Sequence, residues 1–189
     1  MHYGPYLKQF TEGRYKYYRK GGEGEVSGDL NYSDLSNGGD SGNVLNYVRK
    51  TPTALDCDVF LFNCGLHDIK GEVITGKLQV SLSDYQANLE TVCSILTTHS
   101  LQPVWIRSTP VDDAQHTAFC KDFTRTNADL QNYNAAADKI MGDHNIPVID
   151  LYSFTLSLGG SIYADHIHFT EDTRRIQAAY IAGFLNAIE

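Results

Sequence analysis

The sequence has few cysteines, no long apolar run and a deficit of basic residues, and each shortage excludes a class of protein. Its 4 cysteines, at positions 57, 64, 93 and 120, show no Cys-x-x-Cys or other close metal-type spacing, so neither a zinc knuckle nor a disulfide framework is indicated. No stretch reaches the roughly 18 apolar residues of a membrane span, and no basic-then-apolar leader precedes residue 20. Compartment and oligomeric state are left open.

The net charge of −8 disfavours nucleic acid or an anionic membrane as the main partner. The one basic cluster, residues 14–20, interleaves Arg and Lys with Tyr15, Tyr17 and Tyr18. An RNA-binding face is compatible with that pattern. A solvated strand face is the better interpretation, because one short stripe cannot offset the overall acidity. We therefore expect no nucleic acid partner and no membrane partner.

Apolar periodicity places the chain in the α/β class. Its 189 residues, 42% of them hydrophobic, predict one domain spanning residues 1–189. Short β-branched or aromatic runs predict strands, and longer segments with helical spacing predict helices. Strands that alternate with helices indicate a three-layer α/β/α protein with a mostly parallel sheet. The predicted strands are residues 14–19, 58–62, 103–107 and 147–151, and the predicted helices are residues 42–49, 83–99, 128–143 and 171–188.

Local signals refine this prediction. Ser83 and Thr170 are candidate N-caps for the helices that follow them. The continuous apolar runs VFLFN, PVWIR and PVIDL are typical of buried central strands. Residues 21–42 are rich in glycine and follow neither period, which predicts a long loop, and residues 70–83 and 111–126 are long enough to be functional loops.

Polar clusters follow the predicted strands, where open parallel sheets form their ligand sites. One runs from Gly65 to Asp68, a second begins at Ser108, and the third is YADHIHFT, residues 163–170. In the third, Asp165 and His168 are three residues apart, so a short turn can set the carboxylate beside imidazole Nδ1–H and leave Nε2 free to take a proton. The alternative is that the acid caps the turn and the imidazole is a polar surface group.

Taken together, these blocks resemble the SGNH/GDSL-type ester hydrolases, particularly the branch acting on carbohydrate acetyl esters, over most of the chain. NCGLHD, residues 63–68, resembles the third block of the family, which implies that Gly65 and His67 belong to the oxyanion and substrate-binding region. DHIHFT resembles the fifth block, which implies that His168 is the base and Asp165 its acid partner. SNGGDSGN, residues 36–43, resembles the second block and implies an oxyanion-binding N–H at Gly39. The implied fold is flavodoxin-like.

The chain departs from the family pattern at two positions. His67 stands where the family has an oxyanion-donating Asn; a neutral imidazole N–H can also donate, although a purely structural role is an alternative. Asp68 is expected to hold its loop by accepting backbone N–H bonds. The first strand of the family fold and its Gly-Asp-Ser nucleophile block are absent from this chain, which opens on MHYGPYLKQF, a segment that resembles the helix after that serine.

Two serines are candidates to replace the missing nucleophile. Ser41, in Gly-Asp-Ser at residues 39–41, follows polar residues that cannot form a buried strand, and Ser108 lacks a supporting motif. The absent strand would lie between residues 14–19 and 58–62, and its loss would leave edge groups unpaired.

The resemblance implies a serine esterase that removes an acetyl group from a carbohydrate or a similar small ester, without metal or organic cofactor, and this chain is expected to be inactive or very weak. The alternative is a non-catalytic carbohydrate-binding module. A doubly wound nucleotide binder is disfavoured, because no glycine-rich phosphate turn joins a strand to a helix.

Overall fold

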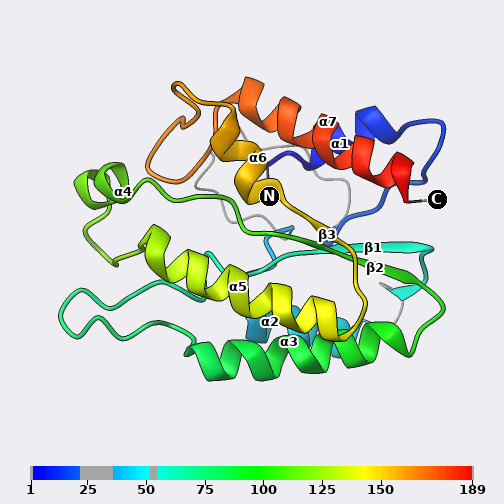
Figure 1. Ribbon diagram of the computed structural model, residues 1–189, viewed down its shortest axis with the longest axis horizontal. Helices are drawn as coiled ribbons and strands as arrows, with labels where there is room; N and C mark the ends of the chain where they lie inside the picture. The colour runs from blue at the N-terminus through cyan, green and yellow to red at the C-terminus, as the bar shows by residue number, and fades with distance from the viewer. Residues whose placement is uncertain (1, 22–35, 52–54, 189) are drawn as a thin grey trace.

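A parallel sheet of three strands, in the order β1-β2-β3, runs through the centre of the computed structural model, which describes residues 2–21, 36–51 and 55–188 (Figure 1). The strands are β1 (Val59–Phe62), β2 (Gln102–Ile106) and β3 (Val148–Ile149). Leu61 is level with Val104, and Trp105 is level with Val148. The predicted α/β class and parallel sheet are confirmed. The predicted loop at residues 21–42 lies largely outside the described residues.

Helices cover both faces of this sheet (Figure 1). On one face lie α1, α6 and α7, on the other α2, α3 and α5, while α4 lies beyond one end of the strands. Among the described residues, no helix combines the length and hydropathy needed to cross a membrane. The helices are α1 (Gly4–Thr11), α2 (Ser41–Lys50), α3 (Leu82–Thr97), α4 (Asp113–Phe119), α5 (Asn127–Asp143), α6 (Leu151–Ser157) and α7 (Glu171–Ala187).

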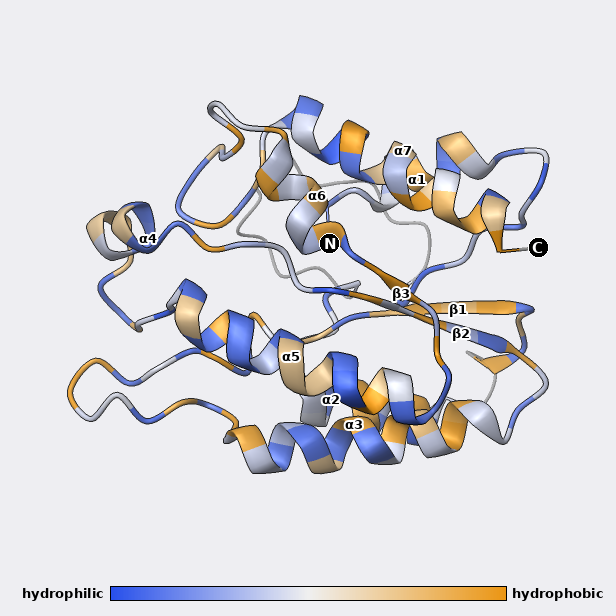
Figure 2. Cartoon of the chain, viewed as in Figure 1, coloured by the Kyte–Doolittle hydropathy of each residue, from blue (hydrophilic) through white to orange (hydrophobic). Residues whose placement is uncertain are grey.

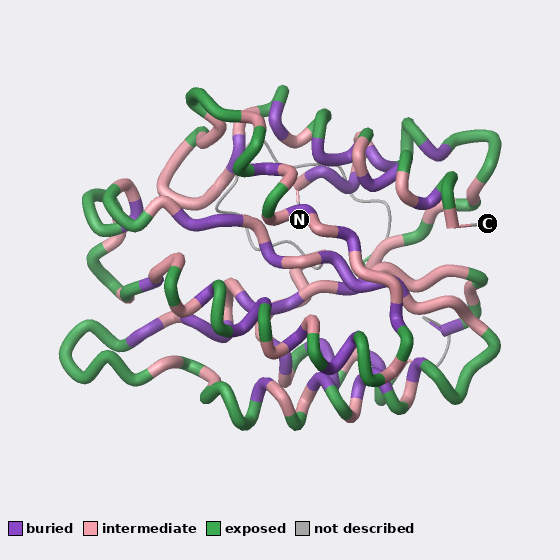
Figure 3. Tube along the Cα trace, in the orientation of Figure 1, coloured by how far each residue is buried: buried purple, intermediate pink, exposed green. Residues whose placement is uncertain are grey.

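Two hydrophobic cores sandwich the sheet, because successive residues of a strand point to opposite faces. On β2, Val104 and Ile106 face the core shared with α1 and α7, whereas Trp105 faces the core shared with α3 and α5. The buried segments of these helices are those turned toward the strands (Figure 3), and β1 and β3 are mainly hydrophobic (Figure 2). The strands therefore form a middle layer whose ends are held firmly by packing on both sides.

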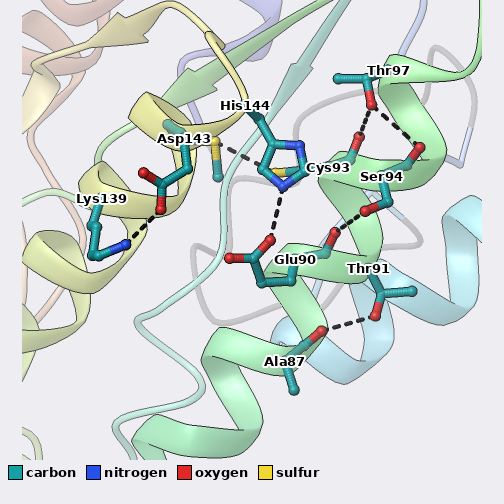
Figure 4. A network of polar contacts seen from close by, with 10 residues as sticks. Ala87, Glu90, Thr91, Cys93, Ser94, Thr97, Lys139, Asp143 and His144 are labelled. Atoms are coloured by element: carbon teal, nitrogen blue, oxygen red, sulfur yellow. Dashed lines mark hydrogen bonds and ion pairs between the residues drawn. The ribbon is translucent and has the colours of Figure 1, made fainter.

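The pairing of α3 with α5 follows from their apolar stripes. Four apolar side chains of α3 predicted to share one face are all fully buried: Tyr85, Leu89, Val92 and Leu96. At the far end of the pair, Cys93 Sγ lies 3.7 Å from Met141 Sδ, and His144 Nε2 lies 2.8 Å from Glu90 Oε2 (Figure 4). The N-cap of α3 is Ser81, not Ser83 as predicted, and its Oγ accepts a hydrogen bond from the Asp84 N–H at 3.1 Å.

The sheet is narrower than predicted. Residues 14–19 form no strand; Tyr15 instead donates its hydroxyl to the carbonyl of Leu185 and packs with Tyr17 against the core of α1 and α7. No neighbouring strand among the described residues offers this segment a ladder to join. For the same reason β1 pairs only with β2, and its first three residues are partly exposed, contrary to the buried central strand that VFLFN predicts.

The periodicity of apolar residues did not predict two short helices, α4 and α6. The predicted strand 147–151 ends at Ile149, because Asp150 accepts a hydrogen bond from the Ser153 N–H at 3.0 Å and begins α6 at Leu151. The predicted loop 111–126 contains α4, which Asp112 caps in the same way. Each helix has 7 residues, which is too short to display a helical repeat of apolar residues.

Candidate active site

The loop that precedes α7 folds into a tight turn that presents two of the predicted site residues. Tyr163 and Phe169 pair as an isolated antiparallel bridge and stack their rings with centroids 4.9 Å apart. Inside this pair, the Ala164 N–H donates to the carbonyl of His168 at 2.7 Å. Thr170 closes the turn and caps α7, as predicted. The turn therefore brings Asp165 and His168 to the same side.

Within the turn, His168 Nδ1 lies 2.6 Å from Asp165 Oδ2. The other oxygen, Oδ1, accepts the backbone N–H groups of Ile167 and His168, each at 2.8 Å. Burial by itself would raise the pKa of Asp165, but these donors and the imidazole outweigh it and the pKa is lowered. An ionised carboxylate bonded to Nδ1 holds the imidazole with Nδ1 protonated, which leaves Nε2 as the basic nitrogen.

Contacts with the segment after β2 hold the turn in place. Gln115 donates from Nε2 to the carbonyl of Asp165 at 2.6 Å, and the hydroxyl of Tyr163 donates to the carbonyl of Pro110 at 2.9 Å. Figure 1 shows the loop between α6 and α7 on the same side of the molecule as α4. The Asp165–His168 pair thus lies at the end of the sheet where the strands finish.

The segment after β1 turns at Gly65, whose φ of +138° is unfavourable for any residue with a Cβ. A Cβ here would lie 2.8 Å from Ser108 Oγ. That hydroxyl donates to the carbonyl of Cys64 at 2.8 Å and accepts from Asn63 Nδ2 at 3.0 Å. Gly65 therefore lets the loops after β1 and β2 pack closely, and Ser108, only 2% exposed, is part of that packing.

His67 follows on this loop and carries a neutral ring at pH 7. Burial, with the charges of Lys70 and Arg125, lowers its pKa to about 4. Asn37 Nδ2 lies 3.4 Å from His67 Nε2. Because an amide nitrogen only donates, this contact makes Nε2 the acceptor and leaves the ring proton on Nδ1.

Gly39 lies on the loop before α2 with a φ of +71°. Its N–H, predicted as an oxyanion donor, donates to Asn37 Oδ1 at 2.9 Å. Asn37 therefore contacts both Gly39 and His67 and joins the two predicted oxyanion groups. The sequence analysis assigned no role to Asn37, although it lies within the SNGGDSGN block.

Asp68 and Ser41 link the loop after β1 to the start of α2. Asp68 is fully buried, and its Oδ1 accepts the Ser41 N–H at 2.9 Å, the backbone bond expected of it. Ser41 is also fully buried, and its hydroxyl accepts a hydrogen bond from Asn88 Nδ2 at 3.0 Å. Both this hydroxyl and that of Ser108 are buried and hydrogen-bonded, so neither is exposed as a nucleophile would be.

His168 has a neighbouring side chain, His2, that the sequence analysis did not identify as a site residue. The ring of His2, just ahead of α1, meets the ring of His168 edge to face with centroids 5.0 Å apart. The segment before α1 is where the family resemblance implies the nucleophilic serine. The structure thus brings that segment to the imidazole, with a histidine as the neighbouring side chain.

The charge of Arg125 acts on both polar clusters of the site, the loop after β1 and the loop before α7. Its guanidinium is mostly buried, and its Nε donates to the carbonyl of Leu66 at 2.8 Å. Its charge contributes to lowering the pKa of His67, and also that of His166, which lies between Asp165 and His168. Both polar clusters are therefore within the electrostatic reach of one side chain.

No family model and no curated protein sequence matches the chain significantly. The chain does match solved structures. The chain is similar to a lipase/acylhydrolase from Enterococcus faecalis, with a TM-score of 0.65 and 19% identity over 79% of this chain and 72% of that one. A GDSL-like lipase from Bacteroides thetaiotaomicron matches with a TM-score of 0.64 and 14% identity over 80% and 73%. The acetylxylan esterase Axe2 from Geobacillus stearothermophilus matches with a TM-score of 0.60 and 12% identity over 76% and 66%.

The layered parallel sheet, with polar loops gathered at the ends of its strands, defines an α/β protein of the type that carries its site at that edge. More particularly, these likenesses show that the chain has the SGNH/GDSL hydrolase fold, as the sequence resemblance implied.

Proposed function

We propose that this chain carries the acid–base and oxyanion-binding parts of an SGNH-type esterase directed at a small ester, such as an acetyl group on a carbohydrate. The observation that carries the proposal is the 2.6 Å contact between His168 Nδ1 and Asp165 Oδ2. The acetylxylan esterase among the similar structures supports the choice of substrate class.

In this proposal His168 takes a proton from the attacking hydroxyl through Nε2 and later returns it to the leaving alcohol. Asp165 keeps the ring oriented and stabilises the imidazolium that forms. Its lowered pKa supports this role, because the carboxylate stays ionised at neutral pH.

The oxyanion would be bound by His67, from the protonated Nδ1 of its neutral ring, and by the N–H of Gly39, with Gly65 shaping the loop between them. For Gly39 this requires that its N–H exchange the bond to Asn37 Oδ1 for one to the oxyanion.

The nucleophile is proposed to belong immediately before α1, where His2 now lies against His168. As it stands, the chain is expected to hydrolyse esters very weakly or not at all, since Ser41 and Ser108 are buried and hydrogen-bonded elsewhere.

The test compares the turnover of an aryl acetate by four proteins. These are the chain itself, a version in which an apolar strand ending in Gly-Asp-Ser replaces residues 1–3, and that version with either Gly-Asp-Ala or His168→Ala. Only the Gly-Asp-Ser version with intact His168 is expected to turn over the ester. Equal activity in the Gly-Asp-Ala or His168→Ala version would refute the assigned roles, as would a folded Gly-Asp-Ser version without activity.

A non-catalytic carbohydrate-binding module is the second candidate, and the engaged N–H of Gly39 favours it, because a working oxyanion hole needs that donor available. Saturable binding of an acetylated xylo-oligosaccharide by the unaltered chain, with no turnover in the Gly-Asp-Ser version, would support the module over the esterase.

A further inference from the structure

His116 has an unusual environment for a histidine outside the proposed catalytic pair. Its side chain on α4 is only 1% exposed, and neither ring nitrogen has a hydrogen-bond partner among the described residues. Burial and the charge of Arg125 lower the pKa of His116, and the nearby backbone of Phe123, which does not meet the geometry of a hydrogen bond, acts in the opposite direction. Buried polar atoms are rarely left unsatisfied, since each costs on the order of 1–3 kcal/mol. A ligand bound at a ring nitrogen would remove that cost.

Two further metal-binding side chains converge on this ring. Cys120 is the C-cap of α4, one turn after His116, so the two side chains lie on the same face of the helix. His166 comes from the loop before α7, and its ring centroid lies 5.1 Å from that of His116. One ligand atom from each of the three lies within 4.8 Å of the others. Cys120 and His166 are only partly buried, so solvent reaches the cluster from one side.

Two imidazoles and a thiolate form a ligand set that Zn²⁺ prefers, and three protein ligands leave a fourth, open position. Tetrahedral bonds of about 2.0–2.3 Å separate ligand atoms by roughly 3.4–3.7 Å. The three side chains would therefore close by about 1 Å around an ion, which side-chain rotation can supply.

Charges of both signs surround the cluster. Arg125 opposes a dication, and its charge acts on both His116 and His166. The carboxylate of Asp165, whose Oδ1 lies 3.9 Å from His166 Nδ1, has the opposite charge, and Cys120 would bind the ion as a thiolate. A carboxylate next to a ligating imidazole is a common orienting partner in zinc sites.

We propose that His116, Cys120 and His166 form a Zn²⁺-binding site with water as the fourth ligand. The bound ion ties α4 to the loop that carries Asp165 and His168. The site stands apart from the proposed esterase activity, since none of its ligands has a role in that reaction.

The test is a calorimetric titration of the chelator-treated chain, without a histidine tag, with Zn²⁺ at pH 7.5. One ion per chain is expected, with micromolar or tighter affinity. Both Cys120→Ser and His166→Gln should weaken binding at least tenfold, while Cys57→Ser, at a partly exposed cysteine outside the cluster, should leave the affinity unchanged. Far-ultraviolet circular dichroism establishes that each variant is folded.

Co²⁺ supplies an independent readout. The thiolate-to-cobalt charge-transfer band should appear with the unaltered chain and with Cys57→Ser, and should be missing with Cys120→Ser. The proposal is overturned if the chain binds no Zn²⁺, or if folded Cys120→Ser and His166→Gln bind it as tightly as the unaltered chain.

Discussion

At the scale of single residues, the carboxylate of Asp165 combines a structural and a proposed chemical role. It satisfies two backbone N–H groups of its own turn and at the same time contacts His168 Nδ1. Its lowered pKa ties the stability of the turn to pH. A group whose pKa is lower in the folded state contributes stability above its unfolded pKa and loses that contribution as the pH falls through the folded value.

We therefore expect Asp165→Asn to destabilise the protein by about 1 kcal/mol at pH 7, because hydrogen bonds to a charged acceptor are replaced by neutral ones at a partly exposed site. The difference from the unaltered chain should shrink as the pH falls from about 4, the ordinary pKa of an unfolded Asp carboxyl, through the lowered pKa of the folded one, because Asp165 then loses the charge that Asn never has. Urea unfolding at pH 7 and at pH 3 measures it. Asp122→Asn, at an exposed carboxylate, is the control. A difference of the same size at both pH values would contradict the expected linkage.

Because Gly65 has no side chain, the loops after β1 and β2 can pack closely against each other. Gly65→Ala should destabilise the protein by about 2 kcal/mol more than Gly76→Ala, because its φ of +138° is less accessible to alanine and because the added methyl group meets Ser108 Oγ at 2.8 Å. Gly76 also has a positive φ, of +69°, but a Cβ there meets nothing within 4 Å, so its alanine variant reports backbone strain alone. Thermal or urea unfolding measures both, and equal losses would contradict a special requirement for glycine at position 65.

At the scale of elements, Asn134 attaches α5 to the segment that follows β2, next to the ion pair of Arg107 with Asp138. Asn134, only 6% exposed, accepts the N–H of Ser108 at 3.1 Å and donates to its carbonyl at 3.0 Å. This pair of bonds replaces the sheet ladder where the chain leaves the strand. It positions the loop whose far end holds the Asp165–His168 turn through Pro110 and Gln115.

Asn134→Ala should destabilise the protein by about 3 kcal/mol, because it leaves a buried N–H and a buried carbonyl without partners. The same substitution at the exposed Asn132 of the same helix should change the free energy of unfolding by less than about 0.5 kcal/mol. Guanidinium unfolding of the two variants measures the difference. Similar values for both would mean that water replaces the lost amide.

Also at this scale, β1 is the element whose environment differs most from its sequence. Its four apolar residues suit a central strand, yet within the described part of the chain it pairs on one side only and is partly exposed. A run of apolar residues indicates that a strand suits a buried position, but it does not show whether a neighbouring strand is present to pair with it.

At the scale of the whole molecule, the fold is that of the SGNH/GDSL hydrolases, and both of its polar clusters lie within the electrostatic reach of Arg125. The proposed zinc site shares the loop before α7 with the proposed catalytic pair, so one short segment would serve both. That residues 1–189 act as one domain stays a prediction, as do the roles assigned to Asp165, His168, Gly39, Gly65 and His67.

The sequence by itself determined the α/β class, the four long helices and the pairing of Asp165 with His168 three residues later. These features are local: apolar repeats, caps and short turns depend on residues close together in the chain. Only the tertiary structure decided what distant segments do to each other. In the folded chain, the N–H of Gly39 is hydrogen-bonded to Asn37 and the ring of His2 packs against that of His168. His116, Cys120 and His166 lie together as well. These contacts depend on how loops from different strands pack at one edge of the sheet.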